Sequence, residues 1–183
     1  MIPDLVIGAR DTLTDVAFKV CTALSRGHLT AVLSGGGAAT VWSEGAYQSG
    51  DLDFIVEFMA GTVDLEQPMT QLGYDRQGRH YVHRRNQFIV EFPDDQILIG
   101  SESVTEYDSL TKGVLKLHIL TPTDCVRDRL CSFFWYTDIS ALQAAVLVAS
   151  KQVVDIRLVE DWAALEGESA KFAEFMRAFT RNA

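Results

Sequence analysis

The chain has 183 residues, enough for one domain or for one domain with a small appendage. Its composition, 48% hydrophobic and 22% charged, is typical of a globular protein with a full core and excludes a disordered or low-complexity chain. With 16 basic and 25 acidic residues, the formal net charge is −9. This charge argues against nonspecific nucleic-acid binding, although a local basic patch or bridging metal ions could still hold a phosphate.

The three cysteines, Cys21, Cys125 and Cys131, form neither a CxxC pair nor the spacing of a disulfide framework, and we expect them to be reduced. The N-terminus lacks a basic segment followed by a long apolar stretch, which predicts no signal peptide. No uncharged run approaches the ~20 residues of a membrane span. We therefore expect a cytoplasmic protein with no membrane partner.

Helical and strand patterns alternate in the first third of the chain, short strand patterns fill the middle third, and helical patterns follow one another in the last third. The expected helices span residues 11–26, 38–46, 64–72, 123–136, 139–150, 155–165 and 168–181, with N-caps at Thr123 and Asp138. The expected strands span residues 29–33, 51–58, 74–76, 79–83, 87–92, 96–99 and 114–120. The change near Pro122 predicts an α+β architecture with a sheet-based domain, residues 1–121, and a helical C-terminal subdomain, residues 122–183.

A strand that ends in glycines and passes directly into a helix is the first candidate site. After the apolar strand ending at Leu33, the sequence reads Ser34-Gly35-Gly36-Gly37. Because Gly35 and Gly36 have no side chains, the backbone N–H groups at the helix start can come close to a phosphate. The alternative is a tight strand-to-helix turn without a ligand.

Two aspartates begin the next strand. Asp51 and Asp53 are two residues apart, so both carboxylates project from one face, while Leu52 and Phe54 face the core. Carboxylates held side by side repel each other unless a cation neutralises them, and Mg²⁺ prefers carboxylate and phosphate oxygens. The alternative is a solvated strand start, since Asp is common in turns.

A third acidic residue interrupts an apolar strand. Glu91 is the one charge in the segment FIVEF, residues 88–92, where a carboxylate is costly unless it lies at the strand end or meets a cation. If this strand pairs beside the first, Glu91 can face Asp51 and Asp53. The alternative is an acid on an edge strand.

The segments SGGGA, residues 34–38, and SGDLDF, residues 49–54, resemble the motif of the nucleotidyltransferase superfamily that includes DNA polymerase β and kanamycin nucleotidyltransferase. They are most similar to the minimal bacterial branch that contains the abortive-infection toxin nucleotidyltransferases. The usual Ser after the first motif glycine is Gly36 here. The segment TPTDCVRDR, residues 121–129, is similar to the start of the helical part in such proteins. The resemblance implies a nucleotidyltransferase-like fold, with a short mixed β-sheet flanked by helices and a helical C-terminal subdomain.

The resemblance also implies an enzyme. It would move a nucleoside monophosphate from a nucleoside triphosphate to a hydroxyl or phosphate acceptor on RNA, protein or a small molecule, and release pyrophosphate. The turn Ser34–Gly36 would bind phosphates, and Asp51 and Asp53 would bind Mg²⁺. Glu91 would be a third metal ligand or the general base, with two Mg²⁺ ions expected.

Basic residues elsewhere add candidates. The segment Arg76–Arg85 carries six Arg or His residues, which could meet an RNA, a protein acceptor or a nucleotide phosphate, or could form a basic edge that discourages strand aggregation. Lys116 could approach a triphosphate, with a solvated strand face as the alternative. Arg129 could point to the cleft, whereas Arg127 and Asp128 are expected to form surface pairs.

Two classes of function are therefore open. The first is the enzyme described above, including a small-molecule modifier such as an antibiotic nucleotidyltransferase, which shares the chemistry and differs in its acceptor pocket. The second is a binding module, in which the same fold is a catalytically inactive scaffold or one component of a toxin–antitoxin pair with a cognate antitoxin as its partner.

Overall fold

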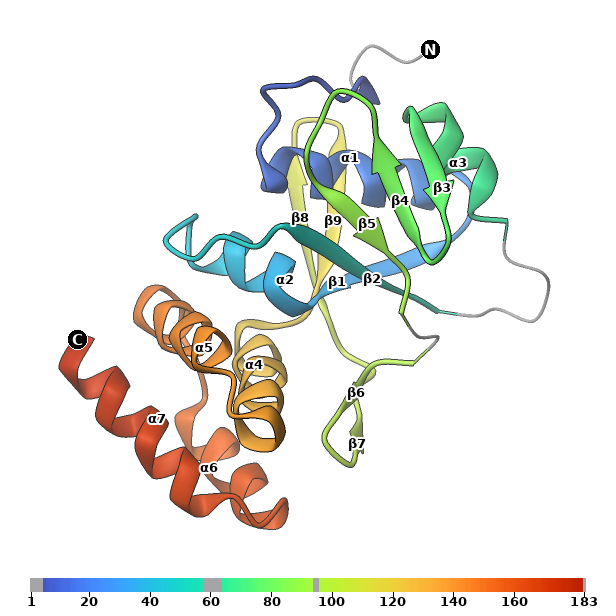
Figure 1. Cartoon of the computed structure of the whole chain (residues 1–183). Helices are drawn as coiled ribbons and strands as arrows, with labels where there is room; N and C mark the ends of the chain where they lie inside the picture. Colours follow the sequence, from blue (N-terminus) through green and yellow to red (C-terminus); the bar gives the residue numbers. More distant parts are fainter. Residues whose placement is uncertain (1–4, 58–63, 94–95, 183) are drawn as a thin grey trace.

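In the part of the chain that the computed structural model describes, residues 5–57, 64–93 and 96–182, a seven-stranded mixed sheet forms the centre of the N-terminal half (Figure 1). The strand order is β3-β4-β5-β2-β1-β9-β8. The bounds are β1 Thr30–Ser34, β2 Asp51–Glu57, β3 Tyr74–Gln77, β4 His80–His83, β5 Ile89–Glu91, β8 Asp108–Lys112 and β9 Leu115–Ile119. Strand β1 is parallel to β9 and β2 is parallel to β5, whereas the other neighbours are antiparallel. The predicted mixed sheet is confirmed.

Helices accompany the sheet at both ends of the sequence. Their bounds are α1 Leu13–Arg26, α2 Gly35–Trp42, α3 Glu66–Gln71, α4 Pro122–Tyr136, α5 Ile139–Lys151, α6 Ile156–Leu165 and α7 Ser169–Asn182. Helix α1 lies across the sheet, behind it in Figure 1. It begins at a capping box, in which the Asp15 N–H donates to Thr12 Oγ1 and the Thr12 N–H donates to the Asp15 carboxylate.

Helix α2 covers the apolar face of β1 and β2. Leu33, Leu52 and Phe54 are fully buried on this face, as the alternation of apolar residues along β2 predicts. A Cβ added to Gly37 would lie only 3.1 Å from Leu33 Cδ1, so the helix packs very close to the strands. The helix begins at Gly35 rather than near residue 38 as predicted, and the glycines form its first turn.

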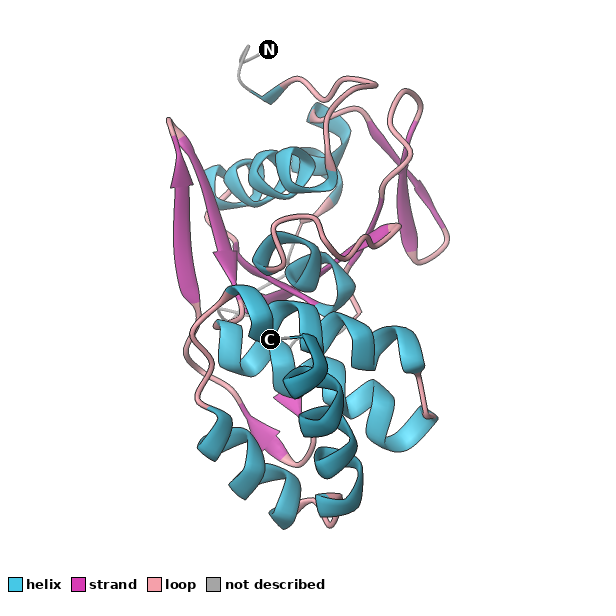
Figure 2. Cartoon of the chain, turned by 90° about the vertical axis from the view of Figure 1, so that its left-hand side faces the viewer, coloured by secondary structure: helices cyan, strands magenta, loops and turns pink. Residues whose placement is uncertain are grey.

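The C-terminal helices form the second part of the molecule. Helices α4 and α5 pack against α2, and α7 packs against α5. Figures 1 and 2 show the C-terminal helices grouped together below the main sheet. The N-cap of α4 is Thr121, whose Oγ1 accepts a hydrogen bond from the Asp124 N–H, so the prediction of Thr123 was wrong. The predicted cap of α5 is confirmed, because Asp138 accepts from the Ala141 N–H.

Two strand predictions differ from the structure. The segment expected at residues 96–99 does not join the main sheet; its last two residues form β6, Leu98–Ile99, which pairs with β7, Glu102–Ser103, in a separate ribbon. Strand β8 was not expected, and it forms one edge of the main sheet beside β9. The predicted end of β2 at Phe58 lies outside the described residues.

Arg127 is not a surface residue, contrary to the sequence prediction. Its side chain is only 5% exposed, and its guanidinium donates to Asp124 at 2.8 Å and to Glu102 of β7. The guanidinium carbon also lies 5.1 Å from the centre of the Trp162 ring. Arg127 therefore joins the β6–β7 ribbon, α4 and α6 at one buried point.

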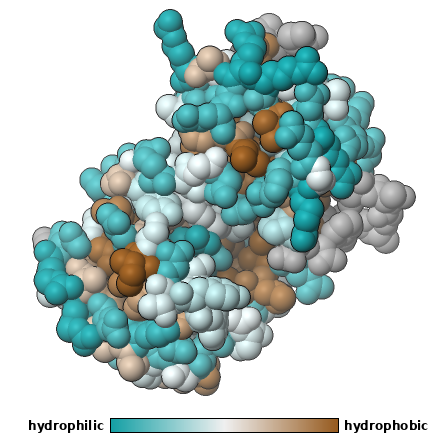
Figure 3. All heavy atoms as spheres, viewed as in Figure 1, coloured by the Kyte–Doolittle hydropathy of each residue, from teal (hydrophilic) through white to brown (hydrophobic). Residues whose placement is uncertain are grey.

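The surface is mainly hydrophilic on the side drawn in Figure 3, with apolar side chains in separate areas. Among the described helices, none combines the length and the apolar composition needed to cross a bilayer.

Replacing Arg127 with Ala should lower the free energy of unfolding by about 3 kcal/mol, because the partly buried carboxylate of Asp124 loses its counter-charge. Thermal unfolding followed by circular dichroism measures the change. Arg157→Ala is the matched control, since Arg157 is exposed on α6 and should shift the melting temperature little. Equal effects of the two substitutions would contradict the structural role of Arg127.

Candidate functional site

The site begins where β1 turns into α2. Ser34 is extended, Gly35 has φ = 63°, and α2 starts at once. Ser34 Oγ donates to the Asp53 carbonyl at 3.2 Å. A Cβ added to Gly35 would lie 2.5 Å from Asp53 Oδ2, closer than real Cβ contacts allow. The glycine is therefore needed for two reasons: the left-handed backbone conformation and the approach of the Asp53 carboxylate.

Neighbouring side chains fill the space beside Gly36 as well. A Cβ on Gly36 would lie 2.6 Å from Ser49 Oγ and 3.6 Å from a ring carbon of Tyr47. The glycines thus form a tight strand-to-helix turn, and the chain before β2 packs into the space that a side chain at Gly36 would fill. The turn brings the start of α2 close to Asp51 and Asp53 on β2.

Three carboxylates share one face of the sheet. Asp51 and Asp53 alternate with the buried Leu52 along β2, and the parallel register pairs Asp53 with Glu91 on β5. Paired residues on adjacent strands project to the same side, with the strands about 4.8 Å apart. Glu91 therefore lies beside Asp53 on the same side of the sheet.

Burial and like charges act on Asp53 together. Its pKa is raised from 3.8 to about 6, first by burial and then by the negative charges of Asp51 and Glu91. The guanidinium of Arg129 opposes this shift, whereas Asp128 adds to it. At neutral pH, the site therefore concentrates negative charge that a cation would neutralise.

Two of the acids have partners inside the site. Asp51 Oδ1 accepts from Ser49 Oγ at 2.7 Å. The Glu91 carboxylate lies 2.6 Å from His80 Nδ1, and the antiparallel register places His80 directly opposite Glu91. The sequence analysis grouped His80 with the basic segment and did not connect it to the acids. Only the pairing of β4 with β5 supplies that connection.

Helix α4 supplies two further residues. The Gly35 N–H donates to Asp128 Oδ2 at 3.1 Å, and the same oxygen accepts from Arg129 Nε and Nη2 at 3.1 and 2.8 Å. Asp128 therefore accepts the hydrogen bond of the first N–H group of α2, which we expected to bind a phosphate. Asp128 is also largely buried and not the surface residue that the sequence predicted. Arg129 lies at the site, as the sequence analysis proposed, with a side chain only 17% exposed.

The structure does not bring Lys116 to this group. The register of β9 with β1 pairs His118 with Val32, so Lys116 lies level with Thr30 at the start of β1. Ser34 is at the other end of that strand, four residues or about 13 Å away. The Lys116 side chain is exposed there, which agrees with the alternative of a solvated strand face.

The basic segment Arg76–Arg85 is partly neutralised by neighbours. Arg76 pairs with Glu66 at 3.1 Å and Arg84 with Asp75 at 2.9 Å. His83 is buried on the side of the sheet opposite to His80. The segment therefore carries less free positive charge than its sequence suggests.

The donor set suits a hard divalent cation, since carboxylate oxygens predominate. Across residues 5–57, 64–93 and 96–182, however, no group of three or more His, Cys, Asp or Glu side chains is arranged so that it could hold a metal ion. Glu91 is turned to His80, and Asp128 to Gly35 and Arg129. The residues able to take up a cation first are Asp51 and Asp53.

Comparison with solved structures identifies the fold. The chain is similar to the crystal structure of an antigenic nucleotidyltransferase-like protein from Paracoccidioides brasiliensis, with a TM-score of 0.55 and 16% sequence identity over 76% of this chain and 77% of that chain. No protein-family model matches the chain, and comparison with curated proteins gives no match. The expected nucleotidyltransferase-like fold is confirmed; at this identity, the similarity concerns the fold alone.

Gly35→Ala should destabilise the protein by about 1–2 kcal/mol, because an L-residue at this φ is strained and its Cβ meets the Asp53 carboxylate. Chemical denaturation measures the loss. Gly50→Ala is the control, since a Cβ there would meet nothing within 4 Å and Gly50 has no positive φ. If both variants unfold like the wild type, the close approach of Asp53 to α2 is not required.

Asp53→Asn should stabilise the protein at pH 8 in metal-free buffer. Because the pKa of Asp53 is raised on folding, its favourable contribution exists below about pH 4 and is lost as the pH rises through about 6. Allowing for partial exposure, we expect a gain of about 1–2 kcal/mol for Asn at pH 8, which raises the melting temperature by about 2–8 °C. The gain should vanish at pH 4. An equal gain at both pH values would show that ionisation is not its cause.

Proposed function

We propose that the protein is a Mg²⁺-dependent nucleotidyltransferase that moves a nucleoside monophosphate from a nucleoside triphosphate to a hydroxyl or phosphate acceptor. One observation carries this proposal: Asp51, Asp53 and Glu91 share one sheet face directly beside the glycine turn at the start of α2. The nucleotidyltransferase-like fold of the structural neighbour supports it.

In the proposed reaction, the acceptor oxygen attacks the α-phosphorus of the triphosphate. The bond between the α-phosphorus and the oxygen bridging to the β-phosphate breaks, and pyrophosphate leaves with that electron pair. When the acceptor is a hydroxyl, its proton passes to the Glu91 carboxylate, which His80 holds at 2.6 Å. In this role, His80 would hold the Glu91 carboxylate in place.

Asp51 and Asp53 would hold Mg²⁺, which supplies positive charge to both the carboxylates and the triphosphate. In the alternative role of Glu91, its carboxylate would leave His80 and hold a second Mg²⁺, and it would then not be the base. The turn Ser34–Gly36 and the guanidinium of Arg129 would then contact phosphate oxygens. For the backbone N–H of Gly35, this requires release of Asp128.

The acceptor is a further part of the proposal. An RNA or protein acceptor would use cations of the basic segment such as Arg79, which has no ion-pair partner among the residues that the structure describes, whereas Arg76 and Arg84 have acidic partners. Assignment to the toxin-type branch, a cognate antitoxin and a bacterial cytoplasmic setting rest on the sequence resemblance. All three are part of the proposal.

One observation favours the second candidate, an inactive binding module. Asp128 satisfies the first N–H of α2, and His80 satisfies Glu91, so the polar groups of the site have partners within the chain. A scaffold with this arrangement would not need a nucleotide. Calorimetric titration with Mg–NTP separates the two candidates, because the enzyme should give metal-dependent heat and the scaffold none.

The double variant Asp51→Asn/Asp53→Asn tests the catalytic proposal. Wild type and variant are incubated with each α-labelled NTP, Mg²⁺ and either RNA or protein acceptors, and label transfer is measured. We expect the variant to lose transfer by about 10³-fold or more. Glu160→Gln, an exposed acid on α6 far along the chain, should transfer like the wild type. Equal transfer by the double variant would falsify the mechanism.

A further inference from the structure

A pocket away from the acidic site lies where four segments of the chain meet. Its volume is 710 Å³, and it is lined by the N-terminal residues 5–7, the last turn of α1, residues 70–73 at the end of α3, and His83 and Arg85 at the end of β4. None of its lining residues belongs to the acidic site. The size falls in the range of small-molecule pockets, about 300–1,000 Å³.

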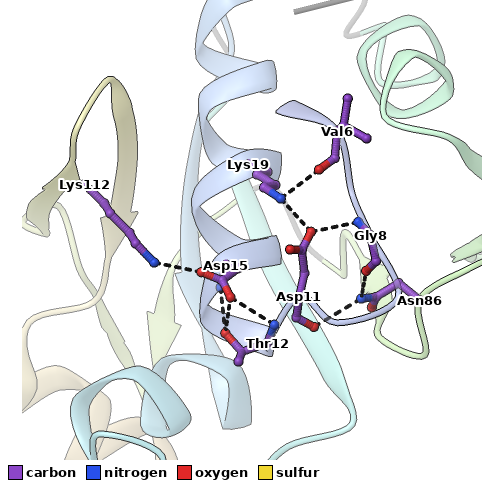
Figure 4. Close-up of polar contacts among 8 residues, drawn as sticks. All are labelled: Val6, Gly8, Asp11, Thr12, Asp15, Lys19, Asn86 and Lys112. Carbon is purple, nitrogen blue, oxygen red and sulfur yellow. Dashed lines mark hydrogen bonds and ion pairs between the residues drawn. The ribbon is translucent and has the colours of Figure 1, made fainter. Parts of the chain in front are cut away.

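The N-terminal wall of this pocket, residues 5–7, is anchored to the rest of the fold (Figure 4). Lys19 Nζ donates to the Val6 carbonyl at 2.7 Å and to the Asp11 carboxylate at 2.5 Å. Asn86 Nδ2 donates to the carbonyls of Gly8 and Asp11 at 2.9 and 3.2 Å. Lys19 of α1 therefore holds residues 5–7 directly, and Asn86 of the loop between β4 and β5 holds the chain just after them.

The interior of the pocket is apolar. Ile7, Ala23 and Leu72 line it and are buried with exposures of 3%, 8% and 5%. His83 completes this surface: its Nδ1 accepts from the Arg85 N–H, and burial lowers its pKa, so the ring is neutral at physiological pH. An apolar ligand body therefore fits against these residues without desolvating a charge.

The described residues that line the pocket carry charge of one sign. Among them, Arg26 and Arg85 are charged and none is Asp or Glu. Within the described residues, neither guanidinium has an ion-pair partner. In a chain with a net charge of −9, an apolar pocket whose described lining has two such arginines and no acid favours an anion.

We propose that this pocket binds a small amphipathic anion, which has an aliphatic or aromatic body and one carboxylate or sulfonate group. The apolar body packs against Ile7, Ala23 and Leu72, and the anionic group binds the guanidinium groups of Arg26 and Arg85. This binding is independent of the acidic site and of the proposed enzymatic activity.

The test uses 1-anilinonaphthalene-8-sulfonate as a fluorescent probe of the full-length protein, with decanoate as competitor. We expect one saturable site, displaced by decanoate. Arg26→Gln and Arg85→Gln should each weaken probe binding by about 5-fold or more. Thr70→Trp, which puts an indole into the lining at an exposed position, should abolish it. All variants should keep the far-ultraviolet circular dichroism of the wild type.

Arg84→Gln is the matched control, because Arg84 adjoins Arg85, pairs with Asp75 and does not line the pocket. It should bind the probe like the wild type. The proposal is overturned if Arg26→Gln, Arg85→Gln and Arg84→Gln bind equally, or if no saturable binding occurs. It is also overturned if Mg–NTP displaces the probe, since the probe would then occupy the acidic site.

Discussion

The approach of the Asp53 carboxylate to Gly35 is the contact on which the arrangement of the site depends. It requires a residue without a side chain at the start of α2, and it sets how closely that helix lies over β2. The contact brings a carboxylate into a partly buried position beside two others, and this raises the pKa of Asp53. Such an arrangement opposes folding at neutral pH. A feature with this cost is expected at a functional site, where stability is given up for chemistry.

Helix α4 makes the C-terminal helices part of the same site. Two neighbouring arginines on this helix act at different places: Arg127 joins the β6–β7 ribbon to α6, while Arg129 lies with Asp128 beside the acids. The described strands precede residue 122 and α4 to α7 follow from it, yet Gly35 lies between residues of both parts, Asp53 and Asp128. The helical part therefore contributes directly to the site.

Local patterns predicted the elements near the site well, because the residues that decide them are close in sequence. The alternation of Asp51, Leu52 and Asp53 determined which side chains share a face, and the lone charge of Glu91 indicated a special position. The roles of His80 and Asp128 were missed because they depend on strand register and on the docking of α4. Lys116 was a candidate for contact with the triphosphate, beside the alternative of a solvated strand face, because no local pattern shows the register at which β9 pairs with β1. Strand β8 was missed because its sequence, DSLTK, has a single apolar residue.

Asp128 Oδ2 accepts hydrogen bonds from the Gly35 N–H, 93 residues earlier in the sequence, and from the neighbouring Arg129 guanidinium. A phosphate that took over the Gly35 N–H would compete for both donors and would leave Asp128 without them. If the turn binds a phosphate, the hydrogen bond between α2 and α4 must therefore rearrange, and α4 is also the helix on which α5 and α6 pack.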